Sequence, residues 1–437
     1  MNRFAVVLLG VALAGCGSKT INQCSTDSDC NVVYPFCDVN GAFPPSGGAT
    51  NVCTIIPPGC SVERCGCSPG ATTCAGDQQT TCNTDGKSTT TDTCALGCST
   101  TENRCLSFKP LNGLGPALTA AAAEPAVVIP PGSTIDTDTG FIRNSAFTKL
   151  NVSTVVVTGS TDIRVFLGGS FDISNVVITG TKAVAFVSPG TVTVRGMIDA
   201  SANLNASGPG ASTTGCVGEV ATDSSNTLGG GGGHVTKGGD GFSDQPDLQH
   251  GGEIILRAPG GASATGSALI GGCIGGGGGS AGGGGGAVQI DSLTKIEFPN
   301  TKLGFIDVGG GGARQSSSRS GGGGAGGLVV LEAPEIVLGS VTANGGSGAS
   351  CLLDGMDATP NQVAAYAGLS MCVSAPRSHG GSGGTFDSGP GGGGGYLGGG
   401  GGGAVGALFV NTLDGTYASV AGSILSAYVT PGTIHPI

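Results

Sequence analysis

The side chains that could carry out acid–base or metal chemistry are few and widely separated. The chain has four histidines, at His234, His250, His379 and His435, and no two of them form an H-x-x-x-H or H-E-x-x-H pair. Zinc and general-base sites need such side chains at short fixed spacings, so that one helix or loop presents them together. We expect each histidine to lie in a loop, and the sequence predicts no catalytic residue and no metal site.

Two pairs of aspartates are close enough in sequence to share a ligand. Asp136 and Asp138 lie in DTDTG, and Asp354 and Asp357 lie in LDGMDA. Oxygen-rich loops can bind calcium, but neither segment has the spacing of an EF-hand or of the glycine-rich calcium-roll repeat. The simpler interpretation is that these carboxylates sit in solvated turns, and no cofactor is predicted. A calcium-dependent binding module remains an alternative.

The first sixteen residues, MNRFAVVLLGVALAGC, read as an export signal. Arg3 supplies a positive charge, and Phe4–Ala14 is apolar but shorter than the ~20 residues that span a bilayer. The segment ends in LAGC, which resembles a bacterial lipobox. That resemblance implies removal of residues 1–15, acylation of Cys16 and attachment to a membrane through the lipid. Gly17, in place of Asp, favours the outer membrane, with the protein facing the periplasm or the cell surface.

Cysteine is unusually frequent in the next segment, residues 16–106. Of the chain's 17 cysteines, those other than Cys16 are Cys24, Cys30, Cys37, Cys53, Cys60, Cys65, Cys67, Cys74, Cys82, Cys94, Cys98, Cys105, Cys216, Cys273, Cys351 and Cys372. In an exported chain with few large apolar residues between the cysteines, this density predicts a disulfide-stabilised module. The connectivity within the module does not follow from the sequence. In the rest of the chain we expect Cys351 to pair with Cys372, and by elimination Cys216 with Cys273.

Residues 107–124 change composition abruptly and are interpreted as a linker, with a helical turn at Leu118–Glu124. From residue 125 the chain consists of short Val- and Ile-rich runs, such as Ile163–Leu167 and Val192–Val194, separated by Gly, Ser, Asn or Pro. Such short, closely spaced strands favour a right-handed parallel β-helix (β-solenoid) over residues 125–437. Its core is expected to take Val155, Val157, Val165 and Leu167. A β-sandwich or jelly roll is the alternative.

Glycine accounts for 88 of the 437 residues, and its runs precede the strongest predicted strands. A motif of a glycine run, a short apolar strand and a second short strand occurs three times, in Gly282–Val308, Gly321–Asn344 and Gly398–Ala427. Glycine runs without side chains could pack closely, like polyglycine II, or could serve as flexible spacers. A phosphate-binding loop is excluded because no run is followed by Lys-Ser or Lys-Thr. The echoes of a serine-hydrolase elbow at Gly345–Gly348 and Gly381–Gly383 are low-complexity sequence.

The formal net charge is −11, and Lys and Arg together number 18. A nucleic-acid-binding protein needs a clustered basic surface, so we expect no nucleic-acid partner. Parallel β-helices often carry polysaccharide lyases and hydrolases, which need clustered acidic and basic side chains on neighbouring coils. The charges in the first β region are instead scattered, at Asp162, Arg164, Asp172, Lys182 and Arg195.

The layout of lipobox, C-x5-C module, VVIPPGSTIDTDTG and glycine-rich coils is similar to that of myxobacterial-type exported lipoproteins with a cysteine-rich, loosely Dickkopf-like module. The resemblance covers nearly the full chain but implies no activity. The sequence therefore favours a non-enzymatic, lipid-anchored surface protein with a structural, adhesive or matrix-binding role, and a surface polysaccharide or matrix protein as partner. The alternative is a carbohydrate-active β-helix enzyme, a polysaccharide lyase or hydrolase.

Overall fold

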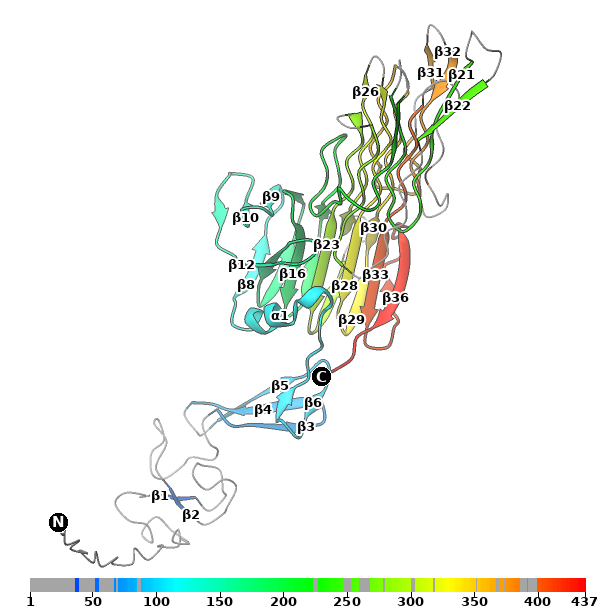
Figure 1. The fold of residues 1–437 in the computed structure, drawn as a ribbon. Helices are drawn as coiled ribbons and strands as arrows, with labels where there is room; N and C mark the ends of the chain where they lie inside the picture. The colour runs from blue at the N-terminus through cyan, green and yellow to red at the C-terminus, as the bar shows by residue number, and fades with distance from the viewer. Residues whose placement is uncertain are drawn as a thin grey trace, which may run out of the picture. The chain divides into compact units, whose positions relative to one another are not determined.

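The computed structural model divides into two compact units, Met1–Leu106 and Ser107–Ile437. The structure describes residues 36–38, 52–54, 67, 70–84, 88–222, 227–246, 253–258, 268–277, 280–299, 303–316, 319–350, 352–366, 369–372, 375–385, 391 and 399–437. Both units are mainly β (Figure 1). Within the described residues, no helix has the length and apolar character needed to cross a bilayer.

The first unit consists of small antiparallel sheets joined by disulfides. Its strands are β1 (Phe36–Asp38), β2 (Val52–Thr54), β3 (Thr72–Ala75), β4 (Gln78–Cys82), β5 (Thr89–Thr93), β6 (Cys98–Ser99) and β7 (Arg104–Cys105). The bridges join Cys67 to Cys82, Cys74 to Cys98 and Cys94 to Cys105. Cys53 is also disulfide-bonded. These bridges supply the disulfide framework that the cysteine density predicted, while Cys16, Cys24, Cys30, Cys60 and Cys65 lie outside the described residues.

The second unit is built from three large sheets that share the same stacking direction (Figure 1). Sheet 1 contains β8 (Ala126–Ile129), β14 (Ser170–Ile173), β17 (Val192–Val194), β24 (Lys295–Glu297), β29 (Glu335–Leu338) and β34 (Ala418–Ser419). Sheet 2 contains β9 (Ser133–Asp136), β10 (Phe141–Arg143), β11 (Lys149–Leu150), β15 (Val176–Thr179), β18 (Met197–Asp199), β25 (Phe305–Asp307), β30 (Ser340–Thr342) and β35 (Leu425–Ser426). Sheet 3 contains β12 (Ser153–Val157), β13 (Ile163–Leu167), β16 (Ala183–Ser188), β23 (Ala287–Ser292), β28 (Leu328–Glu332), β33 (Ala407–Thr412) and β36 (Tyr428–Thr433).

The chain visits sheet 1, sheet 2 and sheet 3 in the same order again and again, and we call one such passage a circuit. Each circuit adds one strand to each sheet, parallel to the strand of the circuit before, as β14, β15 and β16 do over β8, β9 and β13. Antiparallel pairs occur in these sheets where β9, β10 and β11 meet, and between β12 and β13. A β-sandwich or jelly roll is made of antiparallel sheets, so the parallel register does not fit that alternative.

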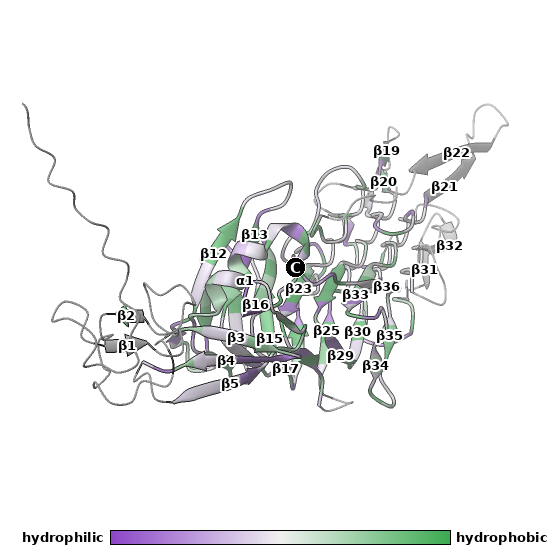
Figure 2. Ribbon diagram, turned by 90° about the horizontal axis from the view of Figure 1, so that it is seen from below, coloured by the Kyte–Doolittle hydropathy of each residue, from purple (hydrophilic) through white to green (hydrophobic). Residues whose placement is uncertain are grey.

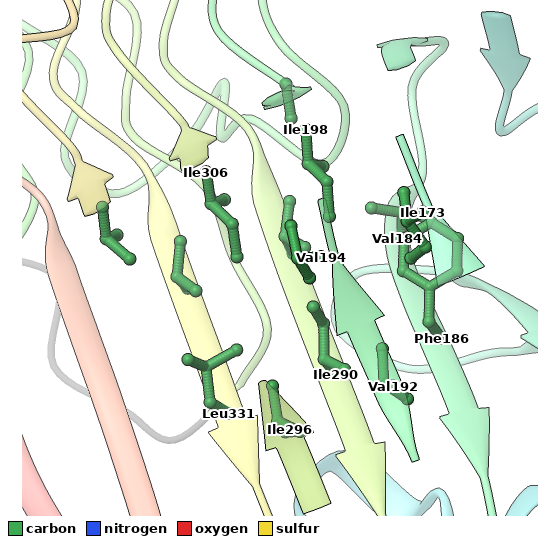
Figure 3. Packing of buried hydrophobic residues seen from close by; sticks show 14 of the residues in the cluster. Ile173, Val184, Phe186, Val192, Val194, Ile198, Ile290, Ile296, Ile306 and Leu331 are labelled. Atoms are coloured by element: carbon green, nitrogen blue, oxygen red, sulfur yellow. The ribbon is translucent and has the colours of Figure 1, made fainter. Parts of the chain in front are cut away.

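The core lies between the three sheets and consists of Val, Ile, Leu and Phe side chains stacked in register. One column runs from Ile198 through Ile306 to Val341, all fully buried. Figure 3 shows Ile198 and Ile306 directed into this core from neighbouring strands, and Figure 2 shows hydrophobic segments in strands of sheets 1–3. The rings of Phe166 in the first circuit and Phe186 in the second stack on each other, with centroids 5.8 Å apart.

The side of sheet 3 that faces the core differs from the expectation. Phe166, rather than Val165 and Leu167, belongs to the main core, and Val155 is 40% exposed. Because side chains alternate along a strand, an error of one residue exchanges the two faces. Val165 and Leu167 are nevertheless buried, since helix α1 (Gly115–Ala121) packs against β13 and β16.

Residues 107–124, interpreted from the sequence as a linker, are part of the second unit. Their helix α1 begins three residues before the predicted turn, with Pro116 in its first turn, where a missing N–H is tolerated. Leu114 and Leu118 are buried beneath it. At the start of the segment, Ser107 exchanges two backbone hydrogen bonds with Ile437 at the end of the chain.

Between sheet 2 and sheet 3 the third, fourth and fifth circuits make long glycine-rich excursions that pack against one another (Figure 1). We call this part the glycine bundle, residues 200–218, 229–240, 268–277, 280–286, 308–314, 321–327, 343–350, 380–385 and 399–406. Most of its residues are buried, and their N–H and C=O groups bond to neighbouring excursions. The described glycine runs therefore pack closely, one of the two interpretations that the sequence left open.

The segment 321–327 shows how the glycine bundle is held together. The N–H groups of six consecutive residues donate to three neighbouring segments in turn, and the order then repeats. These bonds run from Gly322 to Gly276, Gly323 to Gly401, Gly324 to Gly311, Ala325 to Cys273, Gly326 to Ala404 and Gly327 to Val308. A repeat every three residues, with all bonds made to other segments, is the pattern of an extended helix with three residues per turn, like polyglycine II.

The carbonyl groups of the same segment accept from three further neighbours. These bonds come from Ala349 to Gly321, Gly282 to Gly322, Gly232 to Gly323, Gly346 to Gly324 and Gly285 to Ala325. Segment 321–327 is thus surrounded by six glycine-rich segments, 229–233, 268–277, 280–286, 308–313, 343–350 and 399–406. A side chain would fill the space that a neighbouring backbone occupies, which explains why glycine is needed here.

A disulfide joins Cys216 to Cys273 inside the glycine bundle, the pair expected by elimination. The predicted Cys351–Cys372 pair lies outside the residues whose side chains the structure describes. Since the bridge closes a loop with a sequence separation of 57, we expect Cys216→Ala/Cys273→Ala to lose roughly 2–4 kcal/mol of unfolding free energy, measured by urea unfolding. Cys74→Ala/Cys98→Ala, in the first unit, should leave the transition of the second unit unchanged. If Cys216→Ala/Cys273→Ala also leaves the transition of the second unit unchanged, the Cys216–Cys273 bridge does not stabilise that unit.

Candidate functional site

A cavity of about 710 Å³ lies against the outer face of sheet 2, and we call it the sheet-2 cavity. Strands β15, β18 and β25 form its floor, and loops from the glycine bundle and from residues 357–360 form its walls. Its lining residues are Val177, Ile178, Thr179, Gly180, Met197, Asp199, Ser201, Ala202, Asn203, Ala206, Ser207, Asp307, Asp357, Ala358 and Pro360. The volume is within the usual range of ligand sites, about 300–1,000 Å³.

Two aspartates lie side by side on the floor of the sheet-2 cavity. Asp199 and Asp307 occupy equivalent positions at the ends of β18 and β25 and are direct neighbours in the parallel register. The residue before each is Ile198 or Ile306, which points into the core (Figure 3). Because successive side chains of a strand point to opposite faces, the two carboxyl groups face the cavity on adjacent strands.

Asp307 is the more unusual of the two, since only 5% of its surface is exposed. Its Oδ1 accepts hydrogen bonds from Thr342 Oγ1 at 2.8 Å and from the Gly309 N–H at 3.1 Å. Burial, reinforced by the nearby charge of Asp199, raises the pKa of Asp307 to about 7, although both hydrogen bonds oppose the change. Among the hydrogen bonds of the described residues, none reaches Oδ2 of Asp307, so this oxygen is available to a ligand in the cavity.

The remaining carboxyl groups of this region position the walls. Asp199 Oδ1 accepts from the Ser201 N–H at 3.0 Å and from Ser201 Oγ at 2.6 Å. Asp357 Oδ1 accepts from the Leu204 N–H at 2.7 Å and the Gly312 N–H at 2.8 Å. Asp357 therefore ties its loop to two excursions of the glycine bundle and closes one side of the cavity.

Of the aspartate pairs singled out in the sequence, Asp136 and Asp138 share one turn, in which Asp136 Oδ1 accepts from the Asp138 N–H at 2.9 Å. Asp354 accepts from the Gln315 N–H, whereas Asp357 faces the sheet-2 cavity. Hydrogen bonds from Thr181 lead the effects that lower the pKa of Asp138, which also contacts Lys182 at 3.2 Å. Among the described residues, no group of three or more His, Cys, Asp or Glu side chains is arranged to hold a metal ion.

The scattered charges of the first β region also pair locally. Arg195 contacts Asp172 at 2.9 Å, and Arg164 donates to the backbone oxygens of Thr137 and Asp138. None of these cations lines the sheet-2 cavity. Any chemistry there consequently depends on carboxyl, hydroxyl and amide groups.

A second acidic pair is buried under the residues before α1. Glu332 accepts from the Leu111 N–H at 2.7 Å and from Gln289 Nε2 at 3.0 Å, and Gln289 also donates to Asp291. Burial, followed by the charge of Glu332, raises the pKa of Asp291 well above its usual range. Asn112 completes the network by donating to Gln289 at 2.8 Å. These groups are satisfied by one another and hold residues 111–112 on sheet 3, which is a structural role.

The histidines do not come together. His234 is buried in the glycine bundle, where its Nε2 lies 3.2 Å from the Ile270 oxygen and burial lowers its pKa. Its Nδ1 has no hydrogen-bond partner among the described residues. His435 is exposed near the end of the chain, the side chain of His379 is not described, and His250 lies outside the described residues.

Sequence reasoning missed Asp199 and Asp307 because the long glycine-rich excursion of residues 200–286 separates them in the chain. A signal was nevertheless present: each ends a short apolar strand, Met-Ile-Asp in one circuit and Phe-Ile-Asp in the next. No protein family, curated protein or solved structure that was compared with this chain matches it. The chemistry of the sheet-2 cavity is therefore inferred from its geometry alone.

Proposed function

We propose that this protein is a non-enzymatic, lipid-anchored surface protein that binds extracellular material. The observation that carries the proposal is the hydrogen-bond pattern of segment 321–327 of the glycine bundle, which repeats every three residues and joins the segment to its neighbours. Six neighbours fix this segment in every lateral direction, which makes the bundle a stiff scaffold with few side chains for catalysis. A stiff scaffold suits the presentation of binding surfaces at a distance from the cell.

The excursions end in hairpins that suit such a role. The pairs are β19 (Val220–Thr222) with β20 (Thr227–Gly229), β21 (Gly241–Pro246) with β22 (Glu253–Ala258), β26 (Gln315–Ser316) with β27 (Arg319–Ser320), and β31 (Leu369–Cys372) with β32 (Ala375–His379). Figure 1 places β21, β22, β31 and β32 at the end of the glycine bundle away from sheets 1–3. We propose these tips as contact points for a partner.

The finer architecture that goes with this function is a right-handed parallel β-helix. Its support is the repeated order of sheets 1, 2 and 3 along the chain and the parallel pairing of successive circuits. Parallel connections are right-handed in nearly all proteins, because that hand packs the crossover back onto a twisted sheet. The proposed family remains that of myxobacterial-type exported lipoproteins, on the sequence layout alone.

The anchor is tested by Cys16→Ser in cells that express the full chain. We expect the wild type to incorporate a clickable palmitate analogue and to fractionate with the outer membrane, because several acyl chains hold a protein there almost permanently. Cys16→Ser should lose both properties, and cells carrying it should no longer bind a polysaccharide-coated surface. Gly17→Asp is the matched control, which should keep the label and move to the inner membrane. A wild-type protein that stays unlabelled and soluble contradicts the proposal.

A second candidate function is hydrolysis of a polysaccharide, favoured by the adjacent carboxyl groups of Asp199 and Asp307. A carboxyl group whose pKa is raised to about 7 can act as a general acid, and a pair of carboxyl groups is what glycoside hydrolysis uses. A lyase is less well supported, because a uronate substrate needs a cation to neutralise it and none of the described Lys, Arg or His residues lines the cavity. Release of reducing ends by the wild type, lost in Asp307→Asn, would establish this function in place of the first.

A further inference from the structure

We propose that the sheet-2 cavity is a binding site for a neutral saccharide chain. The inference rests on the proposed surface role and names the ligand that this role would need. Binding sites of this kind combine a concave, partly apolar surface with a few converging polar groups. The sheet-2 cavity has both, and each of its features selects against other classes of ligand.

The polar groups of the cavity match a molecule that carries many hydroxyl groups. Asp199 and the free Oδ2 of Asp307 offer acceptor oxygens on adjacent strands, which are about 4.8 Å apart. Carboxylates accept strong hydrogen bonds from hydroxyl groups. Asn203 and Ser207 also line the cavity and can both donate and accept. The lining therefore offers both donors and acceptors to the hydroxyl groups of a sugar ring.

The apolar groups of the cavity match the C–H faces of a sugar ring. Val177 lies on the cavity floor with 45% of its surface exposed, while Val176 and Ile178 on either side of it in β15 are buried. Met197 lies on the neighbouring strand β18, two residues before Asp199, which is the direct partner of Val177, and Pro360 lies in the wall. A concave lining that combines apolar side chains with a few polar groups is typical of ligand sites.

The charge of the cavity excludes acidic sugars and gives little support to cations. Among the residues that the structure describes, no Lys, Arg or His lines the cavity, whereas three aspartates do. A uronate would meet like charge without any neutralising partner, which makes binding unfavourable. For a polyamine, the two backbone N–H groups on Asp357 Oδ1 and the burial of Asp307 leave fewer carboxylate oxygens within reach. We therefore favour a neutral saccharide and make a polyamine the cationic arm of the test.

The test titrates the full-length protein in detergent with hexasaccharides of glucose, mannose, galactose and N-acetylglucosamine, followed by calorimetry. Hexagalacturonate provides the anionic arm and spermidine the cationic arm. The blocking variant is Ala206→Trp, which fills the cavity from an exposed position of its wall. Asp199→Ala removes one acceptor, and Asp172→Asn, in an exposed ion pair with Arg195 that does not line the cavity, is the matched control.

We expect at least one neutral hexasaccharide to bind, and its affinity to fall at least about tenfold in Ala206→Trp and Asp199→Ala, while Asp172→Asn binds as the wild type does. Reducing ends that appear during binding and vanish in Asp307→Asn also support the site and identify the hydrolase. Failure of every neutral hexasaccharide to bind overturns the inference. So does equal binding of hexagalacturonate or spermidine, or unchanged affinity in Ala206→Trp. Membrane labelling of Cys16 is independent of all these outcomes, so loss of the anchor and loss of the saccharide site are separable.

Discussion

Replacing Gly324 by alanine is expected to disrupt the glycine bundle, while the same change at Gly115 is expected to be tolerated. A Cβ at Gly324 would overlap the carbonyl oxygen of Gly283. That backbone cannot withdraw freely, because the Gly283 N–H donates to Leu204 and its carbonyl accepts from Gly311. We expect Gly324→Ala to lose at least about 3 kcal/mol of unfolding free energy, measured by thermal and urea unfolding.

Two substitutions serve as controls for the effect at Gly324. Gly115, at the start of α1, has no atom within 4 Å of an added Cβ, and alanine favours a helix more than glycine does. Gly115→Ala should thus be neutral or stabilising by less than about 1 kcal/mol. Ala325→Gly, next to Gly324 in the same segment, removes one methyl and should cost about 1 kcal/mol. Equal stability of Gly324→Ala and Gly115→Ala would mean that the glycine bundle is not closely packed.

Replacing Asp307 by asparagine is expected to change how stability depends on pH. The carboxyl group of Asp307 has a pKa of about 7 in the folded protein and about 3.9 when unfolded. A raised folded pKa favours the folded state while the group is protonated, so this contribution is complete below about pH 4 and is lost as the pH rises to about 7. Asparagine cannot ionise, and its amide oxygen can still accept from Thr342.

The difference of about three pKa units corresponds to about 4 kcal/mol. The unfolding free energy of Asp307→Asn minus that of the wild type should therefore rise by about 4 kcal/mol from about pH 4 to about pH 8. Urea unfolding at several pH values measures this difference. The effects of Asp291 and His234 are present in both proteins and cancel in the comparison. Asp172→Asn, in the exposed pair with Arg195, should differ by less than about 1 kcal/mol at every pH. A pH-independent difference for Asp307→Asn would show that Asp307 is ionised in the folded protein.

The strands of sheets 1–3 could be predicted where the apolar residues are dense. The bounds of Ile163–Leu167 and Val192–Val194 agree with β13 and β17. Strands such as β24 and β36 were not predicted. Lys295–Glu297 places a single Ile between charges, and Tyr428–Thr433 contains Pro and Gly. Their pairing is imposed by the strand of the preceding circuit rather than by local preference.

The glycine bundle and the sheet-2 cavity could be predicted only in part. Glycine carries no side-chain pattern, so a run such as Gly321–Gly324 does not specify which of six neighbours its backbone will meet. The pairing of Asp199 with Asp307 depends on the register of β18 and β25, which the excursion between them conceals. The mainly β class could be predicted from local sequence, whereas the site depends on contacts between distant segments.

The glycine bundle also bears on how the second unit folds. In most repeat proteins each repeat contacts only its neighbours, so the array can form or fray one repeat at a time. Here the Gly401 N–H donates to Gly229 and the Ala404 N–H to Gly232, which joins the third circuit directly to the fifth. Contacts between residues so far apart in sequence raise the contact order, and a high contact order slows folding. It also makes the excursions one cooperative block, so that an end cannot melt without the middle.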